Sequence, residues 1–342
     1  MTLCGKKNHV AVILFLCVFG ALLTIATFYD LEVSRILTRF SLKEGDYYTN
    51  NVFANFFEAA GMLPHYLLRA FSALSVGWFF YKFLPQKALR ILSLVVGAVA
   101  ATHLLSGAIR DVIFYPMRHM IAEDADKAIA AIGAMTPTVY VISYVASAAV
   151  VGLSVYLTRN VPWDVWRRLV FFAFLYFLID FLSGTIVSGV KGYVDRPRFR
   201  SMNSAYGQEV GGFELYARWY EVSGNNLILR ATPLAKYTDA FRSFPSGHTE
   251  CAALSYSLIL LIDCLQIEKR SVKIWLWTAP IVWTGLTAIG RIVAGAHFMS
   301  DVLMGGTIPF VLTILLREIF LRRFSGVKEM YPFLKKREEV AF

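Results

Sequence analysis

The sequence predicts an all-α fold, a polytopic transmembrane helical bundle of about eight spans. Of its 342 residues, 57% are hydrophobic and 17% are charged, whereas soluble domains are about 45–50% apolar and about 25% charged. The apolar residues gather in runs long enough for a helix to cross the hydrocarbon core of a bilayer. The alternating pattern of a membrane β-barrel is absent, so the spans are expected to be helices.

Eight runs of about 20 residues are the candidate spans. They are Val10–Phe28, Leu63–Phe83, Ile91–Ile109, Pro137–Leu157, Leu169–Val190, Cys251–Cys264 with its flanks, Ile274–Ile289 and Val302–Leu321. The first run follows Lys6 and Lys7, as the apolar part of a signal peptide would. It continues into Tyr29 and Asp30 without a small-residue cleavage pattern, so we interpret it as a retained helix.

Basic residues mark one side of the membrane. The formal net charge is +10, and the short links near Lys82, Arg159 and Lys269 and the C-terminal tail are rich in Lys and Arg. The positive-inside rule makes these segments cytoplasmic, and an even number of spans puts both termini there. The opposite loops carry acids that offset their bases, among them Asp30 and Asp111. For a membrane protein this charge indicates membrane lipids as partners and no nucleic acid.

The expected organisation has three parts. Residues 1–90 form an N-terminal pair of transmembrane helices, residues 91–325 form the core with an extracytoplasmic loop at 191–247, and residues 326–342 form a basic cytoplasmic tail. No N-glycosylation sequon is present, which fits a bacterial inner membrane. The four cysteines lie in or beside apolar segments without a CxxC pair, so neither a disulfide framework nor a metal site is expected.

Three polar segments break the apolar pattern: Lys191–Phe199, Phe244–His248 and Gly290–Asp301. Two spans separate the second segment from the third, and the loop from the first to the second returns to the side that it left. Parity therefore places all three at one membrane face. This placement accounts for the many arginines of an outer loop, where the positive-inside rule expects few.

The cations of these segments suit a phosphoryl group. Lys191, Arg198 and Arg291 can neutralise phosphate through charge-assisted hydrogen bonds. Ser246 and Gly247 open a helix, whose free N–H groups can face an anion.

The histidines suit nucleophilic catalysis. His297 and Asp301 are four residues apart and so share a helix face. A carboxylate there can keep one ring nitrogen protonated and leave the other as a nucleophile. His248 is then available to protonate a leaving oxygen and later to activate water.

The three segments resemble the signature of the phosphatidic acid phosphatase type 2 superfamily, which reads Lys-x6-Arg-Pro, then Pro-Ser-Gly-His, then Ser-Arg-x5-His-x3-Asp. The resemblance covers roughly the last half of the chain, and the family's six-helix core would take in the third to eighth spans. It implies that His297 is the nucleophile, that Asp301 orients it, that His248 is the general acid, and that no metal or other cofactor is required. The residues implied to bind phosphate are Lys191, Arg198, Ser246, Gly247 and Arg291.

Two positions depart from the signature. Phe199 stands where the family usually has Pro, and Gly290 stands where it usually has Ser. Arg196-Pro197 offers a competing register for the Arg-Pro pair, but the seven-residue step from Lys191 selects Arg198.

The resemblance implies an integral membrane phosphatase of lipid metabolism that acts through a phosphohistidine intermediate, with its site facing the periplasm or exterior. The expected substrates are lipid phosphate monoesters or diphosphates of the phosphatidate, phosphatidylglycerophosphate or isoprenyl diphosphate type. A soluble sugar phosphate, a lipid phosphotransferase reaction at the same site and a scaffold without activity are alternatives. A phosphate or lipid transporter is another, although no inverted repeat is found. The oligomeric state is left open.

Overall fold

The computed structural model describes residues 4–120, 125–222 and 240–323. Within these ranges every regular element is a helix, which confirms the predicted all-α fold. The predicted basic tail, residues 326–342, lies outside the described residues.

Seven long helices and several short ones make up the described chain. The long helices are α1 (Cys4–Thr38), α3 (Leu63–Phe83), α4 (Lys87–Met120), α5 (Ala125–Thr158), α6 (Trp163–Val194), α12 (Arg270–Val293) and α13 (Met299–Arg317). The short ones are α2 (Val52–Ala60), α7 (Phe199–Asn203), α8 (Ala205–Glu209), η1 (Gly212–Leu215), α10 (Gly247–Ala253), η3 (Leu254–Ile259), α11 (Leu260–Cys264) and η4 (Glu318–Arg323).

Six of the described helices are long and apolar enough to cross a membrane: α1, α4, α5, α6, α12 and α13. The polytopic helical bundle is thereby confirmed, and the protein is an integral membrane protein. Two of the eight predicted spans differ from the others. Leu63–Phe83 is the single helix α3, and Cys251–Cys264 falls within the consecutive short helices α10, η3 and α11.

Both segments lie inside the bundle, and the helices of the second are each too short to cross a membrane. The side chains of His65, Ser72 and Ser75 on α3 are buried, as are those of Glu250 and Ser257 in the broken segment. A helix covered by other helices can carry such groups, since their hydrogen-bond partners lie within the protein. The lipid-facing helices show the opposite pattern, with exposed side chains that are large and aliphatic.

The outer faces of α4 and α5 illustrate this. Val99 on α4 is 64% exposed, and Val141 and Val145 on α5 are 64% and 65% exposed. Contiguous aliphatic surface of this kind is unfavourable in water and indicates contact with lipid.

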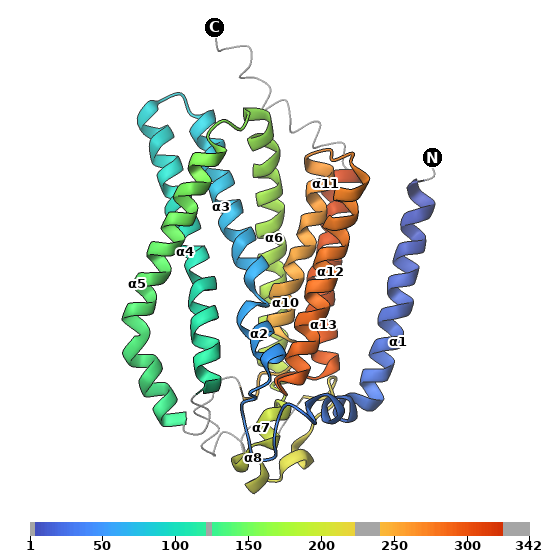
Figure 1. Ribbon diagram of the computed structural model, residues 1–342. Coiled ribbons are helices and arrows are strands. Elements are labelled where there is room, and N and C mark those ends of the chain that lie inside the picture. Colours follow the sequence, from blue (N-terminus) through green and yellow to red (C-terminus); the bar gives the residue numbers. More distant parts are fainter. Residues whose placement is uncertain (1–3, 121–124, 223–239, 324–342) are drawn as a thin grey trace.

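The bundle has two distinct ends (Figure 1). α1 begins at the same end at which α13 ends, and the links from α3 to α4, from α5 to α6 and from α11 to α12 also lie there. The start of α10, the junction of α12 with α13, and α7 and α8 lie at the opposite end. The three polar segments are therefore gathered at one end of the bundle, as helix parity predicts.

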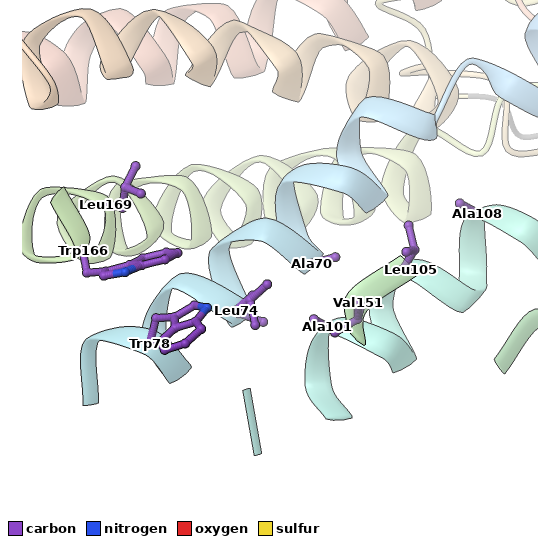
Figure 2. Packing of buried hydrophobic residues seen from close by; sticks show 10 residues of the cluster. Ala70, Leu74, Trp78, Ala101, Leu105, Ala108, Val151, Trp166 and Leu169 are labelled. Atoms are coloured by element: carbon purple, nitrogen blue, oxygen red, sulfur yellow. The ribbon is translucent and has the colours of Figure 1, made fainter. Parts of the chain in front are cut away.

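The core near the other end, where α3 is linked to α4 and α5 to α6, is built from aromatic and small residues (Figure 2). Trp78 of α3 stacks on Trp166 of α6, with ring centroids 5.6 Å apart. α3 also approaches α4 closely, because a Cβ atom on Gly97 would lie 2.7 Å from the Cα atom of Gly77. Small residues at a helix crossing favour such tight packing in membranes.

Candidate active site

His297 lies in the turn between α12 and α13, and its side chain is buried. Its Nδ1 atom is 2.7 Å from the carbonyl oxygen of Ser243. A carbonyl oxygen only accepts, so Nδ1 carries the hydrogen of the neutral ring and Nε2 keeps a lone pair. Nε2 in turn lies 3.4 Å from Nη1 of Arg198. Burial and the Arg198 guanidinium lower the pKa of His297 well below its usual value, which keeps the ring neutral.

Asp301 is close to His297 but does not hydrogen-bond to it directly. Its Oδ2 atom is 3.7 Å from Nδ1 of His297. The same oxygen accepts from the Ser243 hydroxyl at 2.5 Å and from the backbone N–H of Phe298 at 2.7 Å. The carboxylate thus fixes Ser243, and the Ser243 carbonyl fixes the ring. Sequence reasoning missed Ser243, because a backbone carbonyl leaves no signature in residue types.

The two arginines of the Arg-Pro registers have separate surroundings. Nη1 of Arg198 also lies 3.2 Å from the carbonyl oxygen of Ala296, so Arg198 spans the turn that carries His297. The guanidinium of Arg196 is fully buried and donates to Oδ1 of Asp301 at 2.7 Å and to the Ala217 carbonyl at 2.7 Å. Arg198 therefore contacts His297, the candidate nucleophile, and Arg196 binds the Asp301 carboxylate.

Ser246 and Gly247 begin α10, as expected from the sequence. The Ser246 hydroxyl caps the helix by accepting from the Thr249 N–H at 3.3 Å, and the Ser246 N–H donates to the Asp301 carbonyl at 2.9 Å. A Cβ atom on Gly247 would lie 3.4 Å from Nζ of Lys191. The Lys191 ammonium therefore reaches the N-terminus of α10, where both favour an anion.

His248 follows on the first turn of α10. Its ring meets the Tyr115 ring of α4 edge to face, with centroids 5.3 Å apart. The Nε2 atom is buried, and no described residue forms a hydrogen bond with it. A proton donor or acceptor of this kind suits a partner that arrives with the substrate.

The three segments thus bring together a histidine with an unprotonated Nε2 atom, several cations and a helix N-terminus. Residues 168–325, which include all of them, match the family model of the PAP2 superfamily. This segment belongs to the PAP2 superfamily. Neither the curated proteins nor the solved structures gave a match to the chain. Membership indicates phosphatase-type activity on phosphate esters, in a protein with membrane helices, with lipid phosphates as the substrate class of the family.

Residues that precede the PAP2 segment complete the site. Asp30 of α1, counted among the loop acids by its sequence position, is instead helical and buried. Its carboxylate accepts from the Ser300 N–H at 3.0 Å, from the Ser300 hydroxyl, and from Nη2 of Arg196 at 3.0 Å. α1 is thereby joined to the same arginine that holds Asp301. This contact could not be predicted from residue spacing, since the partners of Asp30 lie far away along the chain.

A second carboxylate comes from α2. Oε1 of Glu58 lies 3.0 Å from Nη1 of Arg291 and 3.7 Å from Nη1 of Arg200, and all three side chains are buried. The Arg200 guanidinium also lies over the ring of Tyr47 at 4.8 Å. Arg291, one of the expected phosphate ligands, is therefore paired with a carboxylate. In the sequence, the signal for such a pair is that Glu58 is a lone acid in an aromatic stretch.

The two departures from the family signature are explained by packing. A Cβ atom on Gly290 would lie 2.8 Å from the Cβ atom of Phe57, so α2 occupies the space that a serine would need. Phe199 packs against Phe213, with ring centroids 4.8 Å apart, and against Phe298 at 6.3 Å. Both substitutions therefore fit the aromatic surroundings of this chain.

Proposed function

We propose that this protein hydrolyses lipid phosphate monoesters or diphosphates through a phosphohistidine intermediate on His297, without a metal ion. The observation that carries the proposal is the orientation of one imidazole. The Ser243 carbonyl holds Nδ1, and Nε2 is directed toward the Arg198 guanidinium. A phosphoryl group bound by that cation would present its phosphorus to the free lone pair.

In the first step, Nε2 of His297 attacks phosphorus and the bond from phosphorus to the leaving oxygen breaks. His248 donates a proton to that oxygen, so the lipid alcohol or phosphate leaves protonated. Lys191, Arg198 and the N–H groups at the start of α10 stabilise the charge on the equatorial oxygens. In this protein those cations belong to the PAP2 segment.

In the second step, water attacks phosphorus, His248 takes a proton from that water, and the bond from phosphorus to Nε2 breaks. Inorganic phosphate leaves and His297 returns to its starting form. Asp301 acts indirectly, since it holds Arg196, Ser243 and the Phe298 N–H around the turn that carries His297.

The same proposal places the site at the non-cytoplasmic face and both termini in the cytoplasm. It is supported by the basic links of the sequence, which join the helices at the end of the bundle opposite the three polar segments. Headgroup-level cations also suit a phosphate whose lipid tail remains between helices.

Phosphate release by detergent-purified protein tests the proposal. The assay contains a chelator and compares phosphatidate, phosphatidylglycerophosphate, an isoprenyl diphosphate and a sugar phosphate. We expect release from a lipid substrate, loss of release in His297→Ala, and an acid-labile phosphoprotein in wild type only. Turnover that persists in a folded His297→Ala protein would contradict the mechanism. A phosphorylated alcohol in place of free phosphate would instead indicate a phosphotransferase.

A further inference from the structure

A second polar region lies outside the three motif segments. A cavity of about 330 Å³ opens between α3, α4 and α5. Six of its lining residues are polar or charged: Tyr66, Arg69, His103, Arg110, Asp111 and Tyr140. Ionisable groups within a transmembrane bundle are costly, and they usually line a pathway or a binding site.

Most of these groups have hydrogen-bond partners within the bundle. Arg69 donates two hydrogen bonds to Asp180, at 2.8 and 3.1 Å, and the Tyr66 hydroxyl donates to Asp111 at 2.6 Å. Arg110 differs. Its guanidinium lies 4.6 Å from the centre of the Tyr140 ring, and no ion pair among the described residues includes it. An arginine has donors only, so a bound group beside it would offer acceptor oxygens.

One face of α4 carries a residue that lines the cavity and a residue that contacts the catalytic centre. Asp111 and Tyr115 are four residues apart on that helix, and the Tyr115 ring contacts the His248 ring. In the proposed reaction His248 protonates the leaving oxygen. The leaving group therefore departs on the side of the phosphorus that α4 covers, and the cavity lies next along this face.

We infer that this cavity is the leaving-group subsite and that Arg110 binds acceptor oxygens adjacent to the scissile bond. Such oxygens come from the ester carbonyls of a glycerolipid or from the second phosphate of a diphosphate. The inference rests on the proposed function and deepens it. It makes Arg110 a specificity-determining residue for lipids that carry polar oxygens beyond the transferred phosphoryl group.

The test compares wild type with Arg110→Gln on four substrates. Phosphatidate carries ester carbonyls and an isoprenyl diphosphate carries a second phosphate, whereas an isoprenyl monophosphate and a small aryl phosphate carry neither. The matched control is Arg159→Gln, since the Arg159 guanidinium lies 3.7 Å from the centre of the Tyr156 ring in a similar stack, outside the cavity.

For Arg110→Gln we expect kcat/KM to fall by about tenfold or more on the substrate that has the recognised oxygens. Hydrolysis of the aryl phosphate and the isoprenyl monophosphate is expected to stay within about twofold of wild type. A fall for phosphatidate alone identifies ester carbonyls, and a fall for the diphosphate alone identifies the second phosphate. The control should match wild type on all four substrates.

Two results would overturn the inference in different ways. An equal change on all four substrates, or none, contradicts the subsite and leaves the phosphatase assignment intact. Failure of wild type to hydrolyse any of the four contradicts the phosphatase assignment and the subsite with it.

If Arg110→Gln does not fold, Leu104→Trp fills the same cavity without removing a charge. It should lower hydrolysis of the substrates with a bulky leaving group, the isoprenyl monophosphate included, more than hydrolysis of the small aryl phosphate. An equal effect on all four substrates, or none, also contradicts the subsite.

Discussion

Glu58 of α2 holds Arg291 of α12 through a buried ion pair of 3.0 Å between Oε1 and Nη1. Arg291 is an expected phosphate ligand, so carboxylate and phosphate share one guanidinium. A bound phosphate would be attracted by the arginine and repelled by Glu58. The Glu58 carboxylate therefore compensates the charge of Arg291, and it lowers the affinity of Arg291 for the phosphate product.

Glu58→Gln should accordingly lower the stability of the protein and strengthen its binding of phosphate. Removing one partner of a buried pair leaves the other charge uncompensated, at a cost of about 3–5 kcal/mol. We expect a lower Tm without ligand and a larger rise in Tm on adding inorganic phosphate than in wild type. Thermal unfolding with and without phosphate measures both.

The control for this experiment is Glu214→Gln, which neutralises an exposed carboxylate in η1. It should behave like wild type in both measurements. A Glu58→Gln protein with the wild-type response to phosphate would show that Glu58 does not oppose the ligand.

Asp30→Asn tests the link between α1 and the PAP2 segment. Asparagine can still accept from Ser300, but it removes the charge that faces Nη2 of Arg196. Because Arg196 holds Asp301, we expect kcat to fall by about tenfold while KM changes little, since no direct phosphate contact is lost. Steady-state kinetics on a lipid phosphate measure the two constants.

Glu32→Gln is the matched control, because Glu32 is two residues from Asp30 on α1 and exposed. It should retain the wild-type kcat. A rise in KM with unchanged kcat in Asp30→Asn would assign Asp30 to substrate binding instead of positioning.

These residues show what the sequence can and cannot predict. The helices follow from apolar runs. His297 and Asp301 do lie close together, but the shared helix face that their spacing predicted is wrong, because His297 lies in the turn before α13 and only Asp301 is helical. Asp30 and Ser300 are 270 residues apart, and their contact depends on how α1 packs against α13. Glu58 likewise meets Arg291 only through the packing of α2 on α12. Such contacts depend on tertiary packing, which residue types and spacing do not specify.

Variants at Ser243 and Asp301 test whether the Ser243 carbonyl or the Ser243 hydroxyl matters more for catalysis. Ser243→Ala keeps the carbonyl that holds His297 Nδ1 and loses only the hydroxyl bond to Asp301. We expect kcat/KM within about tenfold of wild type. Asp301→Asn disturbs Arg196, Phe298 and Ser243 together, and should lower kcat by about a thousandfold or more. Comparable losses in the two variants would contradict this division.

The pH dependence follows from the environment of His297. Burial and Arg198 hold its pKa well below the usual value, so the ring stays neutral as the pH falls through about 6.5. Activity should therefore not decline at that pH through protonation of His297. Arg198→Gln removes one cause of the shift, so the acidic limb of the kcat profile should move to higher pH. An unchanged limb in a variant with measurable activity would contradict this.

The lowered pKa of His297 also makes the stability of the folded protein depend on pH. Below about pH 6.5 the unfolded chain binds a proton at His297 that the folded protein does not bind. The contribution of this residue to stability is therefore complete above that pH and declines as the pH falls. Thermal unfolding of wild type and His297→Ala between neutral and acidic pH should show a steeper decline for wild type.

The packing of α2 on Gly290 predicts the effect of restoring the serine of the PAP2 signature. Gly290→Ser restores the usual family residue, yet its Cβ atom would lie 2.8 Å from the Cβ atom of Phe57. Overpacking of this kind costs about 1–3 kcal/mol, so we expect a lower Tm and reduced activity. Phe57→Ala keeps the Cβ atom but removes the whole ring, which lets α2 move away from position 290. In the double variant the serine should therefore cost less than it does alone, and a double-mutant cycle on Tm measures the difference. Additive effects would show that Gly290 is not set by Phe57, and that the serine of the family is absent here for another reason.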